Sequence, residues 1–265
     1  MRTISSRQHP IVREYRDLAA SADVDGARLL LDGAHLVREA LAAGLSFDSV
    51  AVAVVHTATD SEEGVLARAL EDRGVATFAV RDAAFGAVSP VRAPSGIVAI
   101  VRRRLTTAEA IAEQQGLFAL MISDVQDPGN LGSLVRVAEA AGLTGVIACG
   151  ASANPFSWKA VRGNMGSVLR LPTARSRSLP QTLAALRRSG ARTIAATPRD
   201  GSEPDAVDWS GSIALLVGGE GRGLDDDLIA ACDERVSVPM APPVESLNVA
   251  AAGAVLVYAA WRARR

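Results

Sequence analysis

The stretch DVQDPGNLGSLVRVAEAAG, residues 124–142, begins with turn residues and continues as an amphipathic helix. It overlaps LFALMISDV at 117–125, a continuous apolar run of the kind that forms a buried parallel strand. Pro128 and Gly129 end that strand, and Asn130 is a favoured N-cap residue. A buried strand that leads directly into a helix is typical of an α/β fold. The apolar positions of the helix recur on one face, at Leu131, Leu134, Val135, Ala138 and Gly142.

Arg136 lies off that apolar face, one turn from Ser133. On an isolated helix it would be an ordinary solvated arginine. In an α/β sheet, however, ligands bind at the C-terminal ends of the strands. A helix N-terminus with Asn130 and Arg136 beside it suits an anion or a phosphate. The pattern alone leaves both interpretations open.

Both halves of the 265-residue chain alternate strand and helix patterns, and the length favours two domains. Hydrophobicity drops over 102–116, where three arginines are consecutive, so we place the boundary there: one domain at 1–104 and a second at 105–265. In the first half we expect helices at 6–20, 34–44 and 61–74 and strands at 27–33, 47–55, 75–80 and 96–104. In the second half we expect strands at 117–125, 144–150, 191–198, 212–224 and 234–240. Helices are expected there at 178–190, 225–233 and 246–265, and a helix leading into a loop at 154–172.

Composition excludes several classes of protein. The chain has 28 Lys+Arg and 29 Asp+Glu, which argues against coating nucleic acid through global charge but leaves a local basic face open. Lys159 is the only lysine and does not stand in a phosphate-binding P-loop motif. The three histidines are scattered, so we expect no metal site.

Two distant cysteines and the absence of a signal-peptide pattern favour a reduced, cytoplasmic protein. No uncharged apolar run approaches about 18 residues, so no membrane span is expected.

Two further clusters follow in the second half. LLVGGEGRGL, at 215–224, joins a buried strand to a glycine-rich turn around Glu220. Such a turn can approach a nucleotide or can simply be tight. A dinucleotide fingerprint is excluded because Leu224 stands where its last glycine is required. VPMAPPVESLNVAAAG, at 238–253, places Ser246 as a good N-cap before an unusually apolar helix that must be covered on nearly all sides.

In this order and at this spacing, the three clusters resemble the motifs of the SpoU (TrmH-like) RNA 2′-O-ribose methyltransferases of the SPOUT superfamily. The N-terminal half, with SRQHPIVREYRDL and LLLDGAHLVREAL, resembles that family's RNA-binding extension, which is similar to ribosomal protein L30e. The resemblance implies a smaller α/β L30e-like domain followed by a parallel-sheet domain with a deep trefoil knot. It also implies that the knotted domain forms a homodimer, in keeping with the apolar last helix.

The resemblance further implies S-adenosylmethionine as cofactor. By motif, its binding residues are Gly218, Gly219, Val238, Met240 and Leu247. The acceptor site would consist of Asn130, Arg136, Glu220, Ser246 and Asn248. The loop APPVE departs from the motif because Pro242 stands where glycine is usual, which bears on the path of the cofactor loop.

The implied reaction is attack of a ribose 2′-oxygen on a sulfonium methyl group. The family proposal makes Arg136 the general base. Because a guanidinium normally stays protonated, we favour a role in gripping phosphate or stabilising the developing alkoxide. For the RNA, we expect contacts from Arg7, Arg13 and Arg16 on the first helix, and also consider Arg102, Arg103 and Arg104.

The leading hypothesis is methylation of 23S ribosomal RNA, because the N-terminal domain is long. The alternatives are a tRNA 2′-O-methyltransferase and a non-catalytic RNA-binding ribosome-assembly factor. Short motifs do not specify the modified nucleotide, since RNA targets are recognised largely by shape.

Overall fold

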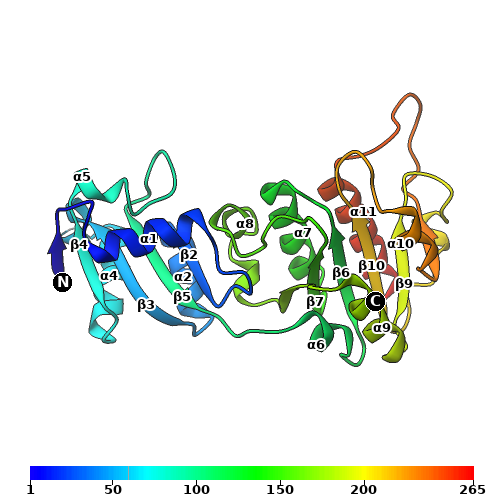
Figure 1. The fold of residues 1–265 in the computed structure, drawn as a ribbon, viewed down its shortest axis with the longest axis horizontal. Helices are drawn as coiled ribbons and strands as arrows, with labels where there is room; N and C mark the ends of the chain where they lie inside the picture. Colours follow the sequence, from blue (N-terminus) through cyan, green and yellow to red (C-terminus); the bar gives the residue numbers. More distant parts are fainter. Residues whose placement is uncertain (59) are drawn as a thin grey trace. The chain divides into compact units, whose positions relative to one another are not determined.

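The computed structural model describes residues 1–58 and 60–265, and the chain forms two compact units (Figure 1). Unit 1 comprises Met1–Leu105 and Phe156–Arg170. Unit 2 comprises Thr106–Pro155 and Leu171–Arg265. The segment 156–170, which lies within the second domain expected from the sequence, therefore packs with the first unit.

Unit 1 is built on a five-stranded sheet of β1 (Arg2–Ile4), β2 (Arg28–Asp32), β3 (Ser46–Ala53), β4 (Thr77–Val80) and β5 (Ile97–Arg102). The strand order is β1-β4-β3-β5-β2. Strands β1, β4 and β3 are parallel, and β5 is antiparallel to both of its neighbours. The helices are α1 (Pro10–Ala20), α2 (Ala34–Ala42), α3 (Val54–Thr57), α4 (Glu62–Asp72), α5 (Asp82–Phe85) and α8 (Trp158–Gly163), with a 3-10 turn η1 (Ser167–Leu169).

Arg103 joins segment 156–170 to the rest of unit 1. Its side chain is buried and donates hydrogen bonds to the carbonyl oxygens of Gly26 and Asp25, each at 2.9 Å. The guanidinium stacks over the ring of Phe156 at 4.1 Å from the centroid. Burial lowers the pKa of Arg103 to about 10. The guanidinium is therefore occupied within the fold.

Unit 2 contains a six-stranded sheet of β6 (Phe118–Ser123), β7 (Gly145–Cys149), β8 (Thr173–Arg175), β9 (Arg192–Ala196), β10 (Ile213–Gly218) and β11 (Glu234–Val236). Its order is β11-β9-β10-β6-β7-β8 and every neighbouring pair is parallel, which confirms the predicted parallel-sheet α/β fold. The helices are α6 (Ala108–Ala112), α7 (Pro128–Ala140), α9 (Leu179–Arg188), α10 (Asp226–Ala230) and α11 (Val249–Ala263), with a 3-10 turn η2 (Pro204–Ala206).

Helices α7 and α11 pack against each other, and α6 packs against α9 (Figure 1). The core that includes α6 and α9 also holds Met121, Ile147 and Leu216 from three neighbouring strands. Residues of β6 are all buried, as expected of a central strand. Strands β6 and β10 each pair with a parallel strand on both sides, so the positions of their ends are fixed by the sheet.

The chain at β11 is enclosed by the segment that follows β9. On one side Thr197 N donates to Val236 O at 2.9 Å. On the other side Ser202 N donates to Arg235 O at 3.0 Å and Ser237 N donates to Ser202 O at 2.9 Å. These contacts are those expected where a chain passes through a loop. The trefoil knot itself stays a prediction.

Candidate methyl-transfer site

The three sequence clusters meet at the carboxyl edge of the sheet in unit 2. Strand β6 leads into α7, β10 leads into the glycine turn at 219–223, and the chain after β11 leads into α11. Because β6 and β10 are parallel neighbours, with Ser123 paired to Gly218, their carboxyl ends lie side by side. This edge is the usual location of ligand sites in open α/β sheets.

Helix α7 begins three residues earlier than we expected. Its N-cap is Asp127, whose Oδ1 accepts from Asn130 N at 2.7 Å, so the prediction of Asn130 as the cap is wrong. The helix starts at Pro128 because proline suits the first helical position, where its missing N–H is not needed. Asn130 lies in the first turn, and its side chain is thereby available for other contacts.

Helix α11 begins three residues later than predicted. Its N-cap is Asn248, whose Oδ1 accepts from Ala250 N at 2.9 Å and from Ala251 N at 3.2 Å. The prediction that Ser246 caps the helix is wrong. Ser246 belongs instead to the exposed loop before the helix.

A chain of hydrogen bonds connects the three clusters. Asn248 Nδ2 donates to Asn130 Oδ1 at 3.1 Å, and Asn130 Nδ2 donates to Glu220 Oε1 at 2.6 Å. The residues are 118 and 90 positions apart in the sequence, respectively. A primary amide has two N–H donors, so each asparagine retains one for a ligand. The carboxylate of Glu220 is held at the end of this chain.

The glycine turn fits tightly against the end of β6. A Cβ at Gly219 would lie 2.1 Å from the carbonyl oxygen of Asp124, and one at Gly218 would lie 2.1 Å from the carbonyl carbon of Gly223. Asp124 itself has a positive φ of 59°. Its carboxylate accepts from Ala151 N at 2.7 Å and from Ser123 Oγ at 2.6 Å. The backbone of Asp124 therefore lies directly against Gly219, the residue before Glu220.

A cavity of about 380 Å³ lies beside this turn. Its volume is in the range of small-molecule sites, roughly 300–1,000 Å³. All five residues predicted to bind the cofactor line it: Gly218, Gly219, Val238, Met240 and Leu247. Glu220, Ser246 and Asn248 line the same cavity. Glycine backbone, apolar walls and a carboxylate suit an organic ligand that has apolar parts and a positive charge.

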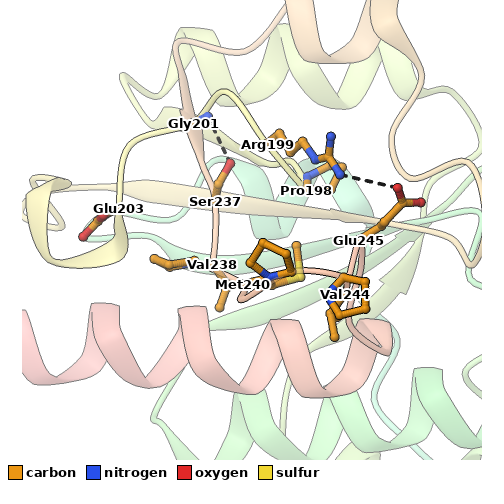
Figure 2. A pocket seen from close by; sticks show the side chains of 12 residues that line it. Pro198, Arg199, Gly201, Glu203, Ser237, Val238, Met240, Val244 and Glu245 are labelled. Carbon is orange, nitrogen blue, oxygen red and sulfur yellow. Dashed lines mark hydrogen bonds and ion pairs between the residues drawn. The ribbon is translucent and has the colours of Figure 1, made fainter.

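A second cavity, of about 620 Å³, adjoins the first and shares Pro198, Val238 and Met240 with it. Figure 2 shows the ion pair across it, in which Arg199 and Glu245 lie 3.6 Å apart. Pro242, the departure from the motif, lines this second cavity and is absent from the lining of the first.

Arg136 stands apart from these contacts. It is exposed on α7, six residues after Asn130, which is about 120° around the helix. Within the described residues it forms no hydrogen bond or ion pair and does not line either cavity. Its guanidinium is accordingly available for an anion outside the cavity.

Cys149 ends β7, next to β6 in the sheet. Burial raises the pKa of the Cys149 thiol to about 12, which keeps it protonated. Among the residues that the structure describes, no group of three or more His, Cys, Asp or Glu side chains could hold a metal ion. In the same residues, no helix is long and apolar enough to cross a membrane.

The predicted RNA contacts lie in or next to unit 1. Arg13 and Arg16 are exposed on α1, and Arg7 precedes it, with its Nε donating to Ala83 O at 2.5 Å. Arg102 pairs with Asp48 at 2.6 Å. The interpretation of Arg103 as a phosphate contact is wrong, because its guanidinium is buried and bonded to backbone carbonyls.

Sequence reasoning missed three residues that shape the site. Asp127 caps α7, Asp124 supports the glycine turn, and Arg222 lines the cavity from within that turn. An acidic residue directly after a buried strand was the available signal for Asp124. An aspartate directly before Pro128 was the signal for Asp127.

The chain is similar to known proteins over most of its length. The model of the SpoU rRNA Methylase family matches residues 117–258. Over 97% of the chain, it is 32% identical to the 23S rRNA (guanosine(2553)-2′-O)-methyltransferase RlmP of Bacillus subtilis (strain 168), of which 98% is covered. An uncharacterized tRNA/rRNA methyltransferase of Synechocystis sp. is 31% identical over 98% of the chain and 93% of its own length.

Solved structures give the same result. The crystal structure of an AdoMet-bound rRNA methyltransferase from Sinorhizobium meliloti is similar to this chain with a TM-score of 0.85 and 27% identity. The match covers 98% of this chain and 97% of the other. The likeness therefore includes both units.

Proposed function

Since the chain belongs to the SpoU rRNA methylase family, we propose that it transfers a methyl group from S-adenosylmethionine to a ribose 2′-hydroxyl of 23S ribosomal RNA. The observation that carries the proposal is the hydrogen-bonded chain Glu220–Asn130–Asn248 beside a cavity that all five predicted cofactor residues line. It joins the three motifs into one site at the sheet edge.

The cofactor, when bound, supplies an electrophilic methyl group in the 380 Å³ cavity. Gly218 and Gly219 line this cavity, and each lies so close to neighbouring backbone that a Cβ would not fit. Val238, Met240 and Leu247 cover its apolar parts. The Glu220 carboxylate, fixed by Asn130, supplies negative charge that complements a sulfonium cation.

The acceptor ribose then has to be aligned with that methyl group. The remaining N–H of Asn130 and the hydroxyl of Ser246 are the polar groups offered to it. Asn248 is a positioning residue, because its Oδ1 caps α11 and its Nδ2 donates to the side chain of Asn130. Arg136 binds the target phosphate or stabilises the developing alkoxide with its planar fork of donors.

Ribosomal RNA is favoured over tRNA by the full-length similarity to RlmP, which includes the N-terminal unit. Ribosomal RNA as substrate, together with the similarity to the bacterial 23S rRNA methyltransferase RlmP, supports a cytoplasmic location. Exposed apolar side chains on α11, Val255 and Tyr258, support a homodimer through unit 2.

The test is transfer of labelled methyl from S-adenosylmethionine to purified rRNA and tRNA from a strain that lacks the gene. Alkaline hydrolysis follows, because a 2′-O-methyl group removes the hydroxyl that attacks the adjacent phosphate. We expect a labelled, alkali-resistant dinucleotide from 23S rRNA.

Arg136→Lys should lower kcat by on the order of 100-fold, because the bidentate fork is lost.

Label found only in tRNA would mean that the substrate is tRNA and not 23S rRNA. No transfer together with no cofactor binding would favour the non-catalytic assembly factor. Near-normal turnover by Arg136→Lys would refute the role given to the fork. Arg73→Gln, an exposed arginine of unit 1, is the control that should leave kcat unchanged.

A further inference from the structure

Unit 1 lies outside the matched methylase region apart from segment 156–170, so its contribution has to be found from its own surface. The sheet of unit 1 has one edge at which the carboxyl ends of β1, β4, β3 and β2 meet the beginning of β5. This follows from the strand order and from the antiparallel direction of β5. We call it the loop edge.

Two arginines at the loop edge are held beside α5. Arg81 follows β4, and its backbone N–H donates to Ile4 O at 2.9 Å. Arg7 follows β1 and donates from Nε to Ala83 O at 2.5 Å. Both side chains are exposed, and neither has a carboxylate partner among the described residues. The Arg7 hydrogen bond uses one nitrogen and leaves the other two for a ligand.

Two more arginines lie near Asp32, which ends β2. Its carboxylate accepts from Ser89 Oγ at 2.5 Å and from Ser95 Oγ at 3.1 Å, which pins both ends of the loop that carries exposed Arg92. Arg162 is exposed on α8, which packs against β2, the strand that Asp32 ends. Burial raises the pKa of Asp32, and the charge of Arg162 opposes this with a smaller effect. The Asp32 carboxylate is thus already hydrogen-bonded to two serines of unit 1.

Carboxylates do not balance these four cations. At the same edge Glu62 pairs with Arg38 and Glu63 lies 3.7 Å from His56, so each has a partner of its own. Asp82, in the first turn of α5, is the exposed acidic neighbour of Arg81. Four exposed guanidinium groups, three on loops and one on α8, have no carboxylate hydrogen bond among the described residues, and such a set suits a ligand with several phosphates.

The outer face of α1 is different. Arg13 and Arg28 line one shallow cavity together with Glu14, Asp17 and Asp23, and Arg16 lies 4.0 Å from Asp17. Positive and negative charges are mixed there. Of the three arginines expected to bind RNA, Arg7 alone lies at the loop edge.

We propose that the loop edge of unit 1 binds backbone phosphates of the RNA substrate through Arg7, Arg81, Arg92 and Arg162. The inference rests on the proposed function, because it takes RNA as the ligand. It assigns the footprint to this edge and not to the outer face of α1.

The experiment measures the dissociation constant of full-length protein for a 23S rRNA fragment at several salt concentrations. The variant carries Arg7→Gln, Arg81→Gln, Arg92→Gln and Arg162→Gln. Each lost phosphate contact should reduce the slope of log K against log salt by about 0.7–0.9, so four contacts reduce it by about three units. Each single variant should lose about one unit, which keeps the test valid if the quadruple variant folds poorly.

The matched controls are Arg73→Gln, an exposed arginine at the opposite edge, and the double variant Arg13→Gln and Arg16→Gln. Both should bind RNA with an unchanged slope. An unchanged slope in all four single variants, or a loss of slope in the α1 double variant, would overturn the inference. Methyl transfer by the unaltered protein separates this failure from failure of the proposed function.

Discussion

At the scale of single residues, two asparagines and one glutamate from three separate segments are joined by hydrogen bonds between their side chains. Glu220, Asn130 and Asn248 come from motifs with fixed spacing, so the sequence was sufficient to bring them together. The caps were misplaced because aspartate, asparagine and serine are all good N-caps. The choice among neighbours depends on where the backbone turns, as at Pro128, which can begin a helix as well as end a strand.

Gly219 gives the sharpest prediction at this scale. In Gly219→Ala the new Cβ would lie 2.1 Å from the carbonyl oxygen of Asp124, and a backbone atom cannot yield as a side chain can. We expect the affinity for S-adenosylmethionine, measured by calorimetry, to fall about tenfold or more, since overpacking costs about 1–3 kcal/mol. Gly86→Ala is the control, because its Cβ meets nothing within 4 Å and φ is −63°. Equal affinity for the two variants would contradict the close fit.

At the scale of elements, long strands and helices were predictable and several short ones were not. Strands β1 and β8 have three residues each, too few for a periodic pattern, and were missed. The strand expected at 234–240 ends at Val236, because the chain beyond it is bonded to the segment after β9. Sheet order depends on pairings that are far apart in sequence, and hydrophobic periodicity carries no information about them.

Gly201 tests how closely the loop surrounds the chain at β11. A Cβ there would lie 2.6 Å from the carbonyl carbon of Val236, and Gly201 N donates to Ser237 Oγ at 3.0 Å (Figure 2). We expect Gly201→Ala to lower the free energy of unfolding by about 1–3 kcal/mol, because the enclosed backbone has no room to move. Urea denaturation followed by circular dichroism would measure the loss. A midpoint equal to that of the unaltered protein would show that the loop opens without cost.

At the scale of the whole molecule, length and alternating patterns predicted two α/β domains. In the structure, one boundary between the two units lies after Leu105. The return of 156–170 to unit 1 was not predictable. It depends on Gly26, where a Cβ would lie 2.3 Å from the ring of Phe156, and on Arg103 stacked over the same ring. Such contacts join residues about 130 and 53 positions apart, beyond the reach of local patterns.

The proposed homodimer depends on exposed apolar side chains of α11. Val255 and Tyr258 are 46% and 41% exposed, and with Val238 and Pro239 they line a hollow of about 320 Å³. Burying this apolar surface against a second copy would remove it from water. We expect light scattering to give the mass of a dimer, and the double variant Val255→Glu and Tyr258→Glu to give that of a monomer.

Val65→Glu, at an exposed apolar position of α4 in unit 1, is the matched control and should remain dimeric. A single exposed apolar residue is ordinary on protein surfaces, so this variant separates the effect of added charge from the effect of its position. A monomeric unaltered protein, or a dimer that survives both glutamates on α11, would mean that this face does not join two copies. Because the N-cap of α11 is Asn248 and the helix packs on α7, loss of the dimer should also reduce methyl transfer.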